Sequence, residues 1–141
     1  MGISKKIVVR NVPVERGRNP EKIIDDTGFN QRDIDYEVLH TMPDSEHNEV
    51  HVHFFKVGRR LTFDDLKKEY ELRGLVPNPR AQAAVNERDP SFVDEHPNGS
   101  QWGDKCFLTF YRWIDDELNV RCDRDNGGGW HEDWWFAGVR K

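Results

Sequence analysis

The C-terminal segment DNGGGWHEDWWFAGVRK, residues 125–141, constrains the fold more than any other part of the sequence. Its last part places Trp134 and Phe136 on one side of an extended chain and Trp135 and Ala137 on the other. Because successive side chains of a β-strand point to opposite faces, such a strand would be apolar on both faces. A strand of this kind is normally covered on both faces. The segment therefore predicts a buried terminal strand with Trp134, Trp135 and Phe136 in the core.

Trp130 stands apart from these aromatic residues, in the connection before the predicted strand. Three glycines precede it, and His131, Glu132 and Asp133 follow it. A glycine-rich, polar connection is typical of a surface loop. Among the aromatic residues of this C-terminal segment, Trp130 is therefore the one that we expect to be exposed, with His131 beside it.

The composition supports one folded domain over residues 1–141. Only 35% of the residues are hydrophobic and 33% are charged, but the chain contains five Trp, eight Phe and three Tyr. Each aromatic side chain buries a large area, so these residues supply the core that the aliphatic residues do not. Disordered chains are poor in such residues. We expect a β-rich part over 1–60, a helical part over 61–98 and an antiparallel β-meander over 104–141.

The predicted fold class is α+β, with an antiparallel sheet built from both chain ends and the short helices of the middle packed to one side. β-rich runs predict strands at 5–10, at 35–40 with 49–57 as a hairpin, and at 105–113 with 117–122 as a second hairpin. Helix signals consist of a capping residue followed by proline or by a polar first turn. They predict helices that start after Asn19, Thr62, Asn78 and Asp89, whereas residues 97–104 are expected to form a loop.

The second hairpin yields a testable register. A two-residue turn at Asp115-Asp116 would pair Trp113 with Leu118 and Tyr111 with Val120. Arg112, Phe110 and Arg121 would then share the face that does not point to the core. Cys106 would lie opposite Asp125 rather than Cys122, so no disulfide bond is expected.

The order of elements in residues 75–141 resembles the C-terminal half of bacterial C-type-lectin-like domains, whose last strand often ends in a similar aromatic phrase before arginine. It is also similar to uncharacterised bacterial proteins with a Trp-rich C-terminal strand. Calcium-dependent sugar binders of that family carry Glu-Pro-Asn and Trp-Asn-Asp phrases. The sequence here has Glu95-His96-Pro97-Asn98 and Trp130-His131-Glu132 instead. The resemblance therefore implies a scaffold that presents loops for binding, without calcium-assisted sugar recognition.

His51 and His53 are the clearest candidates for metal binding. They are two residues apart in the predicted strand EVHVHFFKV, so their imidazoles would point to the same face. Two imidazoles placed in this way can hold Zn²⁺, Cu²⁺ or Fe²⁺ if one or two further ligands join them. His40, His47 and Glu49 are the candidates for completion. The alternative is a solvent-facing strand that carries two histidines without a metal.

The distribution of charge indicates whether the chain binds nucleic acid. The net charge of −5 argues against a dedicated nucleic-acid binder. Residues 1–22 carry six Lys or Arg against two Glu, and residues 25–50 carry eight acidic residues against one Arg. These two blocks would face each other across the fold. Arg112, Arg121 and Phe110 on one face nevertheless keep single-stranded nucleic-acid binding as a third hypothesis.

The sequence contains no recognisable catalytic motif, so the predicted function is binding rather than catalysis. We expect a small, non-catalytic, cytoplasmic module that binds a protein or another macromolecule and needs no cofactor. No stretch approaches the roughly 20 apolar residues of a membrane helix, so no membrane partner is expected. The alternative is a metal-dependent enzyme centred on His51 and His53. The expected binding residues are exposed aromatic and cationic side chains: Trp130, His131, Trp102, Arg112 and Arg121.

Overall fold

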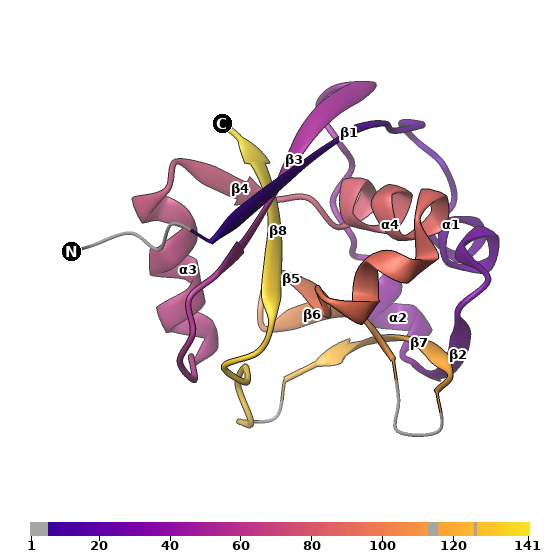
Figure 1. Cartoon of the computed structure of the whole chain (residues 1–141). Helices are drawn as coiled ribbons and strands as arrows, with labels where there is room; N and C mark the ends of the chain where they lie inside the picture. The colour runs from indigo at the N-terminus through magenta and orange to yellow at the C-terminus, as the bar shows by residue number, and fades with distance from the viewer. Residues whose placement is uncertain (1–5, 113–115, 126) are drawn as a thin grey trace.

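The computed structural model describes residues 6–112, 116–125 and 127–141. These residues form one eight-stranded sheet with helices on both of its faces (Figure 1). The strands are β1 (Ile7–Pro13), β2 (Asn30–Ile34), β3 (Glu49–Lys56), β4 (Leu75–Pro77), β5 (Asn98–Trp102), β6 (Cys106–Arg112), β7 (Leu118–Arg124) and β8 (Trp135–Arg140). The helices are α1 (Pro20–Thr27), α2 (Tyr36–Leu39), α3 (Phe63–Leu72), α4 (Pro79–Arg88) and the 3-10 helix η1 (Pro90–Asp94).

The sheet confirms the α+β class. The strand order is β1-β3-β8-β5-β6-β7-β2, and β4 pairs with β8 beside β5. Both chain ends contribute, because β3 lies between β1 and β8. The sheet is mixed rather than wholly antiparallel, since β5 runs parallel to β8 and β2 runs parallel to β7. The second parallel pair arises because the chain crosses from β1 to the opposite edge of the sheet before it forms β2.

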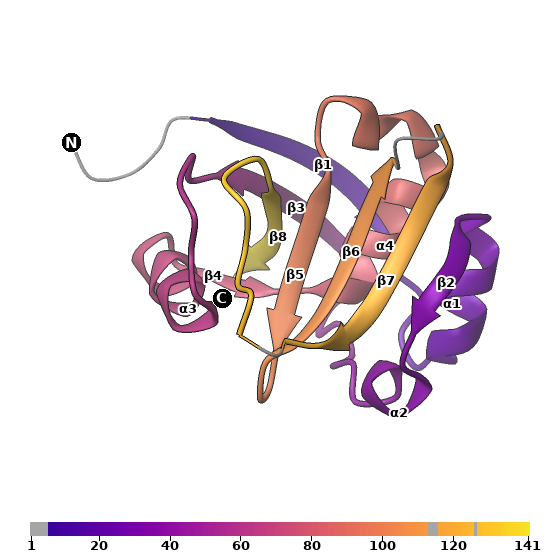
Figure 2. The same ribbon diagram turned by 90° about the horizontal axis from the view of Figure 1, so that it is seen from below.

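Helices cover the two faces of the sheet unequally. α1, α2 and α4 lie on one face, and α3 lies on the other, so the middle helices are not all on one side as expected (Figure 2). Two core clusters fill the α4 face. A third cluster lies under α3 and includes Phe55, Tyr70, Trp130 and Phe136. Phe136 is buried as predicted, and Trp134 and Trp135 are half-buried and pack against these clusters.

β5 corrects the prediction of a loop over residues 97–104. Its residues 98–101 are buried although three of the four are polar. Asn98 and Ser100 point to the α4 face, where Asn98 Oδ1 accepts hydrogen bonds from Gln82 (3.0 Å) and Asn86 (2.9 Å). Ser100 Oγ donates to Gln82 Oε1 at 2.6 Å. Because each buried polar group has a partner, a polar segment can occupy the centre of the sheet.

The first predicted hairpin is also wrong, because residues 35–40 are not a strand. They form the short helix α2, whose first amides are capped by Asp35 through hydrogen bonds from Glu37 N (3.0 Å) and Val38 N (3.2 Å). The strand of this region is β2, which precedes the cap. β3 is a strand as expected, but it pairs with β1 and β8.

The β6–β7 hairpin is present with a register one residue away from the predicted one. Phe110 lies opposite Val120, and Thr109 lies opposite Arg121. Trp113 and Asp115, on which the expected turn rests, lie outside the described residues. A shift of one residue moves every side chain of a strand to the other face. Phe110 consequently points into the α4-side core together with Val120, whereas Tyr111 and Arg121 point to the α3 side.

The predicted helix starts are confirmed. Asn19 caps α1, Thr62 and Asp65 form a reciprocal capping box at α3, and Asn78 caps α4. The prolines after Asn19 and Asn78 occupy the first helical turn, where no backbone donor is lost. The segment after Asp89 forms a short 3-10 helix. Short polar signals therefore located these elements correctly.

The oppositely charged blocks of the N-terminal half meet in part. Arg18 forms an ion pair with Asp26, and Lys22 Nζ lies 3.3 Å from Asp26 Oδ1. The backbone N–H of Gly17 donates to Asp44 at 3.0 Å. These contacts fix α1 and the loops around it. None of the described helices is long and apolar enough to cross a membrane.

Replacing Gly99 with alanine should destabilise the protein by about 1–3 kcal/mol, a typical cost of overpacking. A Cβ at this position would lie 2.6 Å from a ring atom of Trp130 and 3.4 Å from Thr109. The indole would have to move away from the sheet. Urea denaturation monitored by Trp fluorescence measures the effect. Gly128→Ala is the control, because its Cβ would approach only Asp125, at 3.8 Å. An equal free energy of unfolding for the two variants would contradict this prediction.

Candidate functional site

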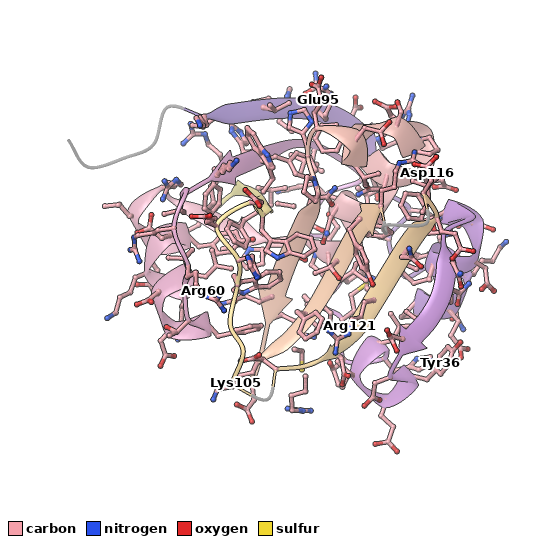
Figure 3. The ribbon with its side chains drawn as sticks, turned by 60° about the horizontal axis from the view of Figure 1, so that its bottom comes forward. Tyr36, Arg60, Glu95, Lys105, Asp116 and Arg121 are labelled. Atoms are coloured by element: carbon pink, nitrogen blue, oxygen red, sulfur yellow. The ribbon has the colours of Figure 1, made fainter. Side chains whose placement is uncertain are left out.

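The candidate site is a groove on the α3 face of the sheet. In the described structure no helix lies over β6 and β7 on this face (Figure 2). Figure 3 shows Arg121 projecting from this uncovered part of β7. A hollow of about 310 Å³ lies between these strands, the start of α3 and the connection that precedes β8. We call it the aromatic groove; its main lining residues are Phe107, Tyr111, Arg121, Arg124, Trp130 and Trp134.

Trp130 forms the inner end of the groove and is 3% exposed, so the expectation that it is exposed was wrong. Its ring stacks on Phe63 with a centroid distance of 5.3 Å, and its Nε1–H donates to Gln101 Oε1 at 2.9 Å. Burial of an indole is favourable once its N–H has a partner. Gly99, which has no side chain, leaves room for the ring against β5. These tertiary contacts bury a residue whose sequence neighbours are polar.

The glycine run places Trp130 by turning the chain tightly. Asp125 Oδ1 accepts hydrogen bonds from the N–H groups of Gly128 (3.1 Å) and Gly129 (3.2 Å). Trp130 then exchanges two backbone hydrogen bonds with Leu61, at 2.7 and 3.0 Å. Gly129 has a φ of 67°, and a Cβ there would lie 2.5 Å from the carbonyl oxygen of Leu61. The connection is therefore tied to the segment before α3 and forms a fixed rim of the groove.

Trp134 and Tyr111 form the accessible aromatic wall. Their rings meet edge to face at a centroid distance of 6.1 Å, and Trp134 also meets Trp130 edge to face at 5.8 Å. Both Trp134 and Tyr111 are half-buried. Edge-to-face contacts hold the rings in place while part of each surface remains open to a ligand. Sequence reasoning missed both residues, since it assigned Trp134 to the core and Tyr111 to the opposite face of the hairpin.

Two arginines supply the cationic wall. The guanidinium of Arg121 lies over the ring of Phe107, 5.3 Å from its centroid, and 3.8 Å from Asp123 Oδ2. Arg124 lies 3.6 Å from Asp104 Oδ2. The side chains of both arginines are nearly half exposed, at 47% and 48%. Long, exposed ion pairs of this kind contribute little to stability. A ligand carboxylate can therefore compete for either guanidinium.

The other predicted binding residues do not reach the groove. Arg112 points to the opposite face, where its guanidinium lies 2.6 Å from Asp94 Oδ1 and 3.4 Å from Asp116 Oδ1. Trp102 packs against the α4-side core and donates its Nε1–H to Thr41 at 2.9 Å. His131 is exposed beside the rim. Of the five residues expected to bind, only Trp130 and Arg121 line the groove. The hairpin register directs Arg112 to the other face, and Trp102 lies on the α4 side of β5.

His51 and His53 lie on the same face of β3, as predicted, and line a separate hollow together with Arg140. Burial lowers the pKa of His53, and the charges of Arg140 and His51 lower it further. Within the described residues, no three His, Cys, Asp or Glu side chains gather in a way that could hold a metal ion. His40, the expected completion from a neighbouring strand, lies at the end of α2 with its Nε2 3.7 Å from Glu21. His47 and Glu49, the other two candidates, line the same hollow as His51 and His53 without forming such a group.

The cysteines form no disulfide bond, as the sequence predicted, and both are buried. They lie on the α4 face of the β6–β7 hairpin, where Cys106 is opposite Arg124 and Cys122 is opposite Leu108. Burial is the main cause that raises the pKa of Cys122 to about 12. At neutral pH this side chain is a neutral thiol, which is a poor nucleophile.

Comparisons with known proteins add no family to these observations. No family model matches the chain, and no curated protein or solved structure matches it. The resemblance of residues 75–141 to C-type-lectin-like domains stays a prediction. The candidate site therefore rests on the geometry of the chain itself.

The thiol of Cys122 should react at least about a hundredfold more slowly with iodoacetamide at pH 8 in the folded protein than in urea, because the neutral thiol is unreactive and buried. Mass spectrometry of peptides cleaved after glutamate measures the modification of Cys106 and Cys122 separately, because Glu117 lies between the two cysteines. The raised pKa means that the folded rate should stay low through pH 8 and above, whereas an unperturbed thiol ionises near pH 8.5. Rapid modification of Cys122 in the native state at pH 8 would contradict the structure.

Proposed function

We propose that this chain is a small, non-catalytic module that binds another macromolecule through the aromatic groove. The observation that supports this best is the part of the sheet over β6 and β7, which α3 leaves uncovered. Trp134, Tyr111 and Arg121 project there, partly exposed. Tryptophan, tyrosine and arginine are the residues that most often dominate the binding energy of protein interfaces.

The chemistry of the groove favours binding over catalysis. Among the described residues that line it, the ionisable groups of ordinary catalytic acids and bases are limited to Asp125 and Tyr111. Asp125 Oδ1 already accepts two backbone hydrogen bonds of the glycine run. The buried cysteines lie on the other face of the hairpin. Covalent catalysis needs a nucleophile and a base within hydrogen-bond reach of each other. The described residues that line the groove do not include such a pair.

A protein segment fits the groove better than a nucleic-acid strand. Arg121 and Arg124 are accompanied by Asp104, Asp123 and Asp125, and the whole chain carries a net charge of −5. A polyphosphate backbone would meet these carboxylates along the groove, and its binding depends on neutralising many phosphates. A peptide with one carboxylate next to an aromatic ring would instead bind one guanidinium through the carboxylate and pack its ring on the aromatic wall. The proposed ligand is therefore a peptide segment that presents an aromatic and an acidic side chain.

A phage-displayed peptide library tests this proposal. Wild-type protein should enrich peptides in which an aromatic residue lies close to Asp or Glu, because the ring can pack on Trp134 while the carboxylate binds Arg121 or Arg124. Trp134→Ala and Arg121→Gln should each weaken an enriched peptide at least about tenfold, or roughly 1.4 kcal/mol. Isothermal titration calorimetry with the synthetic peptide measures the change.

Arg60→Gln provides the matched control, since Arg60 is an exposed arginine outside the groove (Figure 3). It should bind the peptide as the wild type does. Circular dichroism establishes that each variant is folded. Equal affinity of the wild type and Trp134→Ala, or failure of the library to enrich any shared motif, would contradict the proposed function.

A further inference from the structure

β1 forms one edge of the sheet. Among the described residues it pairs only with β3, and its other side has no strand beside it (Figure 1). Seven residues form this edge. The edge of a sheet presents backbone N–H and C=O groups that can pair with another extended chain.

The hydrogen bonds to β3 show which residues of β1 present these groups. Lys56 N–H donates to the carbonyl oxygen of Lys6 at 3.2 Å, and Val14 N–H donates to that of Asn48 at 2.6 Å. In an antiparallel ladder, hydrogen-bonded pairs alternate with pairs whose polar groups point away from each other. Even-numbered residues of β1 therefore bond to β3. The N–H and C=O groups of Ile7, Val9 and Asn11 point outward.

Two features of β1 agree with this alternation between residues that bond to β3 and residues whose backbone groups point outward. Pro13, which has no N–H group, falls at an outward position, where proline leaves the ladder intact. Arg10 Nη1 donates to the outward carbonyl oxygen of Val9 at 3.2 Å. A side chain of an exposed residue can be displaced from such a contact by a backbone N–H group. The outward backbone N–H and C=O groups of β1 can therefore form hydrogen bonds with an added strand.

The outward residues also carry exposed apolar side chains. Ile7 is 46% exposed and Val9 is 43% exposed, and both point to the α3 face of the sheet, opposite Phe55 and His53. α3 covers Phe55 in the third core cluster. β-Branched side chains in an edge strand pack well against apolar neighbours of an adjacent strand. The α3 face of β1 thus favours apolar side chains in an added strand.

The other face of β1 favours acidic side chains. Arg10 points to the α4 face, with its guanidinium 5.1 Å from the centroid of Phe92. In the described segment from Lys6 to Pro13 the charged residues are Lys6 and Arg10, and there is no Asp or Glu. A second copy of this strand would bring the same positive charges, which repel, whereas an acidic strand would bring complementary ones.

We propose that the outer edge of β1 binds an extended segment of a partner protein in which acidic and apolar residues alternate. The backbone of the segment would bond to the outward groups of Ile7, Val9 and Asn11. Its apolar side chains would lie beside Ile7 and Val9 on the α3 face, and its acidic side chains beside Arg10 on the α4 face. Strand addition of this kind gives affinity through the main chain and specificity through alternate side chains. This site is separate from the aromatic groove.

Two synthetic peptides, acetyl-TEVEVET-amide and acetyl-TKVKVKT-amide, test the proposal with full-length protein. Both can add a strand, but only the first matches the charge of β1. The glutamate peptide should bind at least about tenfold more tightly than the lysine peptide at low salt, as fluorescence anisotropy measures. Hydrogen exchange of the Val9 and Asn11 amides should slow in the complex. Equal binding of the two peptides, or no binding of the glutamate peptide, would overturn the proposal.

Two variants of β1 sharpen the test. Val9→Pro removes an outward N–H group without removing a hydrogen bond to β3, and it should weaken the glutamate peptide at least about tenfold. Arg10→Glu should reverse the preference, so that the lysine peptide binds more tightly. Because the second variant keeps every backbone donor, it tests the proposal even if Val9→Pro does not fold. The proposal that β1 binds the peptide would be contradicted if Arg10→Glu still preferred the glutamate peptide. It would also be contradicted if folded Val9→Pro bound the glutamate peptide as tightly as the wild type does.

Control variants separate this edge from other surfaces. Val76→Ser alters another exposed valine, and Trp134→Ala alters the aromatic groove. Both should bind the glutamate peptide as the wild type does. Loss of binding in Trp134→Ala would assign the peptide to the groove and refute strand addition. Sedimentation equilibrium that showed a wild-type dimer, abolished by Val9→Pro, would make a second copy the occupant and overturn the proposed partner.

Discussion

The hydrogen bonds of the buried polar strand β5 are the constraint on which the rest of the structure depends. Asn98 joins β5 to Gln82 and Asn86 of α4 on one face of the sheet. On the other face, Gln101 donates to the carbonyl oxygen of Phe63 at 2.8 Å and accepts from Trp130 at 2.9 Å. A buried polar group without a partner costs about 1–3 kcal/mol, so these side chains permit few alternative arrangements. β5 thereby fixes the positions of α4, α3 and the connection before β8.

The groove is a consequence of this arrangement. Gln101 holds the start of α3 and the ring of Trp130 over β5, so both lie toward the β8 side of the sheet. Within the part of the chain that the structure describes, the neighbouring strands β6 and β7 then lack a helix on that face. Phe107 and Arg121 remain there as the floor and one wall of the hollow. A structural requirement of the core thus creates the surface that we propose for binding.

The accuracy of the sequence-based predictions followed the range of the interactions involved. Caps such as Asn19 and Thr62 act within three residues, and the helices that they start were predicted correctly. The register of the β6–β7 hairpin depends on how many apolar side chains can point into one core. A shift of one residue separated Arg112 from Arg121 and changed the composition of the predicted site. The binding surface was therefore predicted less well than the elements that support it.

The sequence by itself determined the fold class, the helix starts, the buried last strand around Phe136 and the shared face of His51 and His53. These features depend on local capping and on the alternation of side chains along one strand. The tertiary structure alone decided that β5 is a strand and that Trp130 is buried. Both outcomes depend on hydrogen-bond partners from distant segments, because polar residues tolerate burial only when such partners are in place.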